Sequence, residues 1–104
     1  MDQAIRQKIE NDIKKNKVML YMKGTPDAPQ CGFSARTVDI LREYNVPFHS
    51  CNILEDDTIR QGVKEYADWP TIPQLYINGE FVGGCDIMTE LHETGELGKI
   101  LGNS

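Results

Sequence analysis

The chain has 104 residues, 39% hydrophobic and 26% charged, which predicts one globular domain over residues 1–104. The formal net charge of -5 argues against nucleic-acid binding, because that binding neutralises phosphates with Lys and Arg. No apolar run approaches the roughly 20 residues that span a bilayer, so we expect no membrane partner. Three cysteines without a disulfide-framework spacing favour a reducing compartment, the cytoplasm. An organelle matrix is the alternative if a transit peptide preceded Met1.

Hydrophobic periodicity predicts alternating helices and strands in the first half of the chain. Ile5, Ile9 and Ile13 recur every fourth residue, as on one face of a helix. The elements expected in order are a helix over residues 2–15, a buried strand over 18–22, a loop over 24–29, a helix from about Ser34 to Tyr44 and a strand over 47–52. Strand, helix and strand at this spacing form a βαβ unit, so the two strands should be parallel.

The second half of the chain predicts a helix, a hairpin and a final helical region. Asp56 and Asp57 can cap a helix that ends before Trp69. The dipeptide Asn78-Gly79 predicts a two-residue hairpin between strands over 74–77 and 80–82. Asp86 can cap a helix that Gly95 closes, and residues 97–101 predict a last helical turn or two. The expected fold is α/β and thioredoxin-like, with a four-stranded mixed sheet and helices on both faces.

The segment Cys31-Gly32-Phe33-Ser34 lies between the first predicted strand and the helix that follows it. A cysteine there lies at a helix N-terminus, where unpaired N–H groups and the helix dipole favour a thiolate. A dithiol redox site would have a second cysteine where this chain has Ser34, which cannot form a disulfide. The pattern predicts a thiol that binds something or exchanges with a small thiol. A structural cysteine is the plain alternative.

Four segments carry a resemblance to a known family: residues 23–26 (Lys-Gly-Thr-Pro), 31–34, 69–74 (Trp-Pro-Thr-Ile-Pro-Gln) and 83–86 (Gly-Gly-Cys-Asp). In order and spacing they resemble the single-domain monothiol CGFS-type glutaredoxins. The resemblance implies glutathione binding and a homodimer that carries and transfers a [2Fe–2S] cluster in iron–sulfur cluster assembly. A [2Fe–2S] cluster usually needs four thiolates, which two copies of Cys31 and two glutathiones would supply. BolA-like proteins and apo iron–sulfur clients are the implied partners.

The resemblance also implies roles around Cys31, which would be both the catalytic thiol and the cluster ligand. Lys23 would lower the pKa of the thiol and pair with a glutathione carboxylate. The loop after Lys23, residues 24–30, would displace bound glutathione and weaken ordinary reductase turnover. Ile72 would precede a cis proline, Pro73, face Cys31 and pair with glutathione through its backbone. A proline that merely starts a strand is the alternative.

Further glutathione contacts are implied on two later helices. The N–H groups of residues 83–86 would receive the γ-glutamyl carboxylate, and Asp86 its amine. Cys85 would line the pocket through its backbone or pair slowly with Cys31. Arg60 and Lys64 would contact the glycyl carboxylate, although exposed helix charges are usually only solvated.

The remaining candidates are expected to be structural. We expect Trp69 to pack and Cys51 to act as a small buried hydrophobe. His49 and His92 are isolated in the sequence, which argues against a zinc site. Two other functions stay open. One is a glutathione-dependent oxidoreductase that uses Cys31 against glutathionylated proteins, with weak activity expected. The other is a redox-sensing adapter that switches through a Cys31–Cys85 pair.

Overall fold

A fully buried strand lies inside the sheet. The computed structural model, which describes residues 1–102, places β1 (Val18–Met22) between β4 (His49–Asn52) and β5 (Gln74–Ile77), with β6 (Glu80–Gly83) at the far edge. β1 runs parallel to β4 and antiparallel to β5, and the 78–79 turn joins β5 to its antiparallel partner β6. The predicted four-stranded mixed sheet is confirmed.

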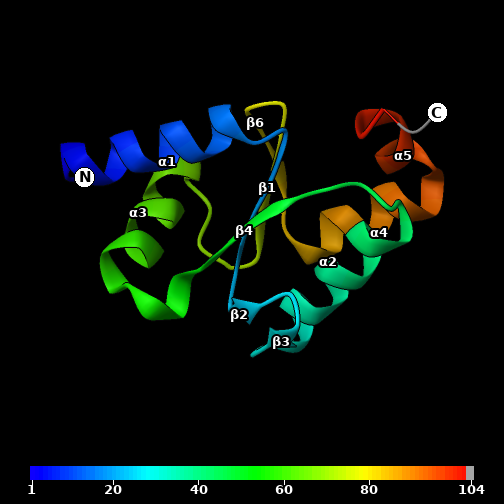
Figure 1. The fold of residues 1–104 in the computed structure, drawn as a ribbon, viewed down its shortest axis with the longest axis horizontal. Coiled ribbons are helices and arrows are strands. Elements are labelled where there is room, and N and C mark those ends of the chain that lie inside the picture. The colour runs from blue at the N-terminus through cyan, green and yellow to red at the C-terminus, as the bar shows by residue number, and fades with distance from the viewer. Residues whose placement is uncertain (103–104) are drawn as a thin grey trace.

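Alternating side chains of β1 enter two separate cores. Leu20 packs with residues of α2 (Gly32–Glu43), α4 (Cys85–Thr94) and α5 (Glu96–Ile100) on one face of the sheet. Tyr21 packs with residues of α1 (Gln3–Lys15) and α3 (Asp57–Ala67) on the other face. Figure 1 shows these two helix groups on opposite sides of the strands. Because both faces are covered, every residue of β1 is buried.

Three local predictions were wrong in detail, and each difference lies near Cys31. α2 begins at Gly32, earlier than the predicted Ser34, so Cys31 itself is the N-cap. The predicted loop over 24–29 contains an antiparallel pair of two-residue strands, β2 (Gly24–Thr25) and β3 (Ala28–Pro29). The pair begins with a left-handed corner at Gly24, φ 91°. α4 is capped by Gly84 and already includes Asp86 in its first turn.

The other helix boundaries agree closely with the sequence pattern. Asp2 caps α1, and Asp56 caps α3 by accepting from the backbone N–H groups of Thr58 and Ile59. A short 3₁₀ helix, η1 (Ile53–Glu55), joins β4 to α3. Among residues 1–102, no helix is both long enough and apolar enough to cross a bilayer.

Candidate functional site

Cys31 lies at the start of α2, in extended backbone conformation at φ -155° and ψ 137°. Its side chain makes no capping hydrogen bond, but the first N–H groups of the helix affect the pKa of its thiol. The Ser34 N–H has the largest effect and lowers the pKa of the Cys31 thiol below its usual value. The Phe33 N–H, the Lys23 ammonium and the Ser34 hydroxyl lower it further, while partial burial opposes them. The predicted position of Cys31 at a helix N-terminus is confirmed.

The backbone of Lys23 is held on both sides next to Cys31. Its N–H donates to the hydroxyl of Ser34 at 3.1 Å, and its carbonyl accepts from the N–H of Gln30 at 2.9 Å. Ser34 is fully buried, so this hydroxyl is a fixed acceptor. The residue that replaces the second cysteine of a dithiol motif therefore positions the cation that favours the thiolate.

A loop ending in a cis peptide bond, Ile72–Pro73, lies opposite Cys31. The cis bond was implied by the family resemblance and is confirmed. Fully buried Gln74 holds this loop, because its side-chain amide donates to the carbonyls of Trp69 at 3.0 Å and Thr71 at 3.2 Å. Two bonds from one buried amide fix the loop that forms the far wall.

The N-terminus of α4 completes the site, with its cap at Gly84, two residues earlier than the predicted cap Asp86. The carbonyl of Gly84 accepts the N–H of Met88 at 3.0 Å and so starts the helix. A Cβ on Gly84 would lie 3.0 Å from the carbonyl oxygen of Pro73, so the close approach to the proline loop favours glycine here. A glycine cap uses no side chain, which is why the sequence pattern pointed to the aspartate instead.

These segments enclose a cavity of about 450 Å³. It brings together six of the seven residues that the sequence and the resemblance nominated. The lining residues come from these four segments and from α3: Lys23, Cys31, Phe33, Lys64, Trp69, Pro70, Thr71, Ile72, Pro73, Gly84, Cys85, Asp86 and Ile87. The volume lies in the range of small-molecule sites, roughly 300–1,000 Å³. The cavity therefore presents one activated thiol, two cations and a helix N-terminus to a small ligand.

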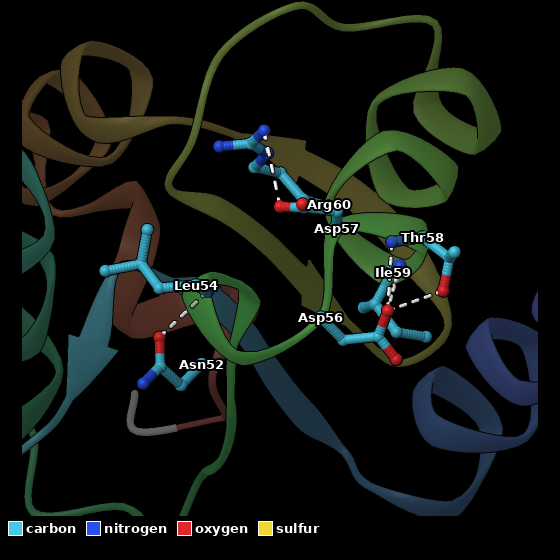
Figure 2. Close-up of polar contacts among 7 residues, drawn as sticks. All are labelled: Asn52, Leu54, Asp56, Asp57, Thr58, Ile59 and Arg60. Atoms are coloured by element: carbon cyan, nitrogen blue, oxygen red, sulfur yellow. Dashed lines mark hydrogen bonds and ion pairs between the residues drawn. The ribbon is translucent and has the colours of Figure 1, made fainter.

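Arg60 is the nominated residue that is not among the described residues lining this cavity. Its guanidinium lies 3.4 Å from the carboxylate of Asp57, one turn earlier on α3 (Figure 2). Both side chains are exposed, so the pair is weak. A contact between Arg60 and a ligand would require the side chain to leave Asp57, and its role stays a prediction.

Two aromatic side chains at the cavity were not nominated as site residues. Phe33 is 62% exposed beside Cys31, and Trp69, expected only to pack, is 37% exposed. Trp69 does pack on Phe81, with ring centroids 5.8 Å apart, but it also lines the cavity. The sequence pattern did not predict this exposure, because Phe33 has helical spacing with Thr37 and Leu41, which are buried.

The other cysteine and histidine predictions have mixed outcomes. Cys51 is half-buried against the core on the α1 and α3 face, and this burial raises the pKa of its thiol. His92 is not isolated in space, because its ring hydrogen-bonds with the Tyr44 hydroxyl and lies 3.2 Å from Glu43. Within residues 1–102, no three His, Cys, Asp or Glu side chains are grouped to hold a metal ion.

Replacing Lys23 with methionine should raise the pKa of Cys31, because the ammonium favours the thiolate. The expected result is a thiolate titration midpoint above that of the wild type, measured by ultraviolet absorbance against pH. The lowered pKa also stabilises the fold of the wild type at pH values above the ordinary pKa of a thiol. We therefore expect Lys23→Met to lose part of this stability in alkaline solution. Lys99→Met, which removes a cation paired with Glu96 on α5, is the control. An unchanged midpoint in Lys23→Met would disprove this role.

The fold and site define a class: proteins of the thioredoxin-like fold with one activated thiol at the start of a helix, facing a cis-proline loop. The Glutaredoxin family model matches residues 18–82. The chain belongs to the glutaredoxin family, and the relatives named below are monothiol members of it.

Two relatives and one solved structure illustrate the similarity. The probable monothiol glutaredoxin 2 of Rickettsia typhi is 57% identical over 93 residues, covering 89% of this chain and 84% of that protein. The mitochondrial monothiol glutaredoxin-S15 of Arabidopsis thaliana is 52% identical over 90% of this chain, which spans only 56% of that protein's length. The solution structure of reduced poplar apo GrxS14 matches with a TM-score of 0.84 at 52% identity, covering 94% of this chain and 90% of that one.

Proposed function

We propose that this monothiol glutaredoxin binds glutathione in the cavity and, as a glutathione-bridged homodimer, carries a [2Fe–2S] cluster as cargo. The observation that carries the proposal is that Cys31 has a lowered pKa and that position 34 has no cysteine. The Cys31 thiol lines the cavity, and Ser34 stands where a resolving cysteine would otherwise be. A stable thiolate without an internal disulfide partner at that position is suited to ligation.

The chemistry of the cavity supports glutathione as the small ligand. Glutathione has two carboxylates, one amine and one thiol. Lys23 and Lys64 offer cations to the carboxylates, and the N–H groups at the start of α4 offer hydrogen bonds to an anion. Asp86 offers a carboxylate to the amine. The backbone of Ile72 lies on the cavity wall, where it can pair with an extended peptide such as the ligand.

The donor set fits a shared cluster better than one held by a single chain. The cavity contains Cys31 and Cys85, while Cys51 belongs to the core on the other face of the sheet. One chain thus lacks the four thiolates that such a cluster usually needs. Two Cys31 thiolates and two glutathione thiolates complete the set, and Cys85 serves the glutathione pocket rather than the metal.

Ligation by an external small thiol makes the cargo exchangeable. Client thiolates can replace the glutathione thiolates one at a time, so an apo iron–sulfur protein is the expected acceptor. A BolA-like protein is the second proposed partner and would replace one subunit of the dimer. We place this activity in a reducing compartment, the cytoplasm or an organelle matrix, because all three cysteines are free.

A second function follows from the same lowered pKa. The Cys31 thiolate could attack the mixed disulfide of a glutathionylated protein, take the glutathione and release the protein thiolate. A second glutathione thiolate would then attack the Cys31 mixed disulfide. Glutathione disulfide would leave, and the Cys31 thiolate would return. This cycle needs no second cysteine, so Ser34 does not prevent it.

Anaerobic reconstitution with iron, sulfide and glutathione tests the choice between these functions. We expect a coloured dimer on a sizing column, with about one cluster and two glutathiones for two chains. Omitting glutathione should leave a colourless protein. Colour without glutathione would overturn the bridged arrangement, and a colourless monomer that deglutathionylates proteins would favour the oxidoreductase.

A further inference from the structure

One side chain at the end of β4 joins two turns that are far apart in the sequence. The side-chain oxygen of Asn52 accepts the N–H of Gly24 at 2.9 Å and the N–H of Leu54 at 3.0 Å. Figure 2 shows the second of these bonds, with the Asn52 oxygen directed at the backbone of η1. A single acceptor thus connects the turn after β4 to the corner after β1.

The position of Asn52 explains why a side chain is needed there. The parallel pairing of β1 with β4 ends at the pair Met22 and Asn52, so the backbone ladder stops before Gly24. Gly24 is buried, and without the Asn52 oxygen its N–H would lose this hydrogen-bond acceptor. A buried N–H without a partner costs roughly 1–3 kcal/mol.

The hydrogen bond from Gly24 to Asn52 also restrains the residues next to Cys31, because the chain is tightly packed at the Gly24 corner. A Cβ built on Gly24 would lie 2.5 Å from the carbonyl oxygen of Ala28 and 2.7 Å from the backbone nitrogen of Gln30. The residues before Cys31 are therefore in close contact with the corner. Gln30 also donates to the carbonyl of Lys23 at 2.9 Å. A fixed position of Gly24 therefore also fixes the backbone of Lys23, which precedes it, and of Gln30, which leads into Cys31.

We propose that Asn52 is a positioning residue that sets Lys23 and the 24–30 segment against Cys31. It acts through its hydrogen bond to the backbone N–H of Gly24. The effect on glutathione affinity rests on the function proposed above, whereas the effect on the reactivity of Cys31 does not. No motif indicates this role, because Asn52 lies 28 residues after the group that it holds.

The test compares two substitutions of similar shape. Asn52→Leu keeps the branched side chain without an acceptor, and Asn52→Asp keeps the acceptor oxygen. We measure hydrogen exchange of the Gly24 amide by NMR and the rate of Cys31 alkylation by iodoacetamide below the thiol titration midpoint. Cys51→Ala in every protein removes one competing thiol, and Asp2→Leu, which deletes the cap bond to Ala4, controls for general loss of stability.

We expect fast Gly24 exchange and severalfold slower Cys31 alkylation in Asn52→Leu, because Lys23 and the 24–30 segment would no longer be held beside Cys31. Gly24 should stay protected in Asn52→Asp, and Asp2→Leu should change neither quantity. Unchanged exchange or unchanged alkylation in Asn52→Leu would overturn the proposal. Neither measurement uses glutathione or iron, so a failed reconstitution would count against the proposed function and leave this result intact. Weaker glutathione binding by Asn52→Leu would then connect the two.

Discussion

Cys31→Ser is expected to abolish cluster binding completely and leave the chain folded. The hydroxyl of serine has a far higher pKa than a thiol, so no soft anionic ligand would remain at position 31. Helix α2 should not suffer, because serine is among the preferred N-cap residues, whereas the Cys31 side chain makes no capping hydrogen bond. The measurements are visible absorbance after anaerobic reconstitution and the free energy of unfolding in urea.

Cys51→Ala is the matched control for this substitution. Cys51 is half-buried on the other face of the sheet, and burial raises the pKa of its thiol. We expect it to retain the coloured dimer at full stoichiometry. If Cys31→Ser still holds the cluster, or if Cys51→Ala loses it, the proposed ligand set is wrong. A loss of cooperative unfolding in Cys31→Ser would show that the cysteine has a structural role instead.

The fold could be predicted from the sequence because its signals are local. The strictly apolar run of β1 predicted a strand covered on both faces, and its alternate residues do enter two cores. The turn at 78–79 predicted the β5–β6 hairpin, which the structure confirms. Helix spacing and cap residues placed α1 and α3 within about a residue, since each has an aspartate N-cap.

The candidate site was predictable only where residue type and chemistry coincide. Cys31 combines a reactive group with a helix start, so the sequence alone identified it. Asn52 and Gln74 act by accepting or donating hydrogen bonds to the backbone of another segment. Such bonds leave no periodic pattern. Gln74 belongs to the 69–74 segment of the resemblance, but its bonds to the loop were not predicted, and no segment of the resemblance contains Asn52. The role of Arg60 stays a prediction, because in the structure this cation pairs with its neighbour Asp57.

The site therefore has two layers with different sequence signals. Cys31, Lys23 and Asp86 present chemistry directly to the cavity. Behind them, close backbone packing at Gly24 and Gly84 sets the distance between segments. A glycine at such a contact is informative only after the structure shows what its missing Cβ would touch.

Gly24→Ala should lower the free energy of unfolding by roughly 2–4 kcal/mol, combining backbone strain with overpacking. Gly24 has φ 91°, a region that alanine rarely adopts, and the added Cβ would lie 2.5 Å from the carbonyl oxygen of Ala28. This neighbour is backbone in a short hairpin, so it cannot move aside as a flexible side chain could. We would measure unfolding in urea together with the alkylation rate of Cys31, which should fall as Lys23 is displaced.

Gly79→Ala separates the two causes of this loss. Gly79 also has a positive φ, 81°, but a Cβ there would have nothing within 4 Å among the described residues. It should lose only the strain contribution, about 1 kcal/mol, and leave Cys31 alkylation unchanged. Equal losses of stability in the two variants would show that the tight corner at Gly24 contributes no packing. An unchanged alkylation rate of Cys31 in Gly24→Ala would mean that this corner does not position Lys23.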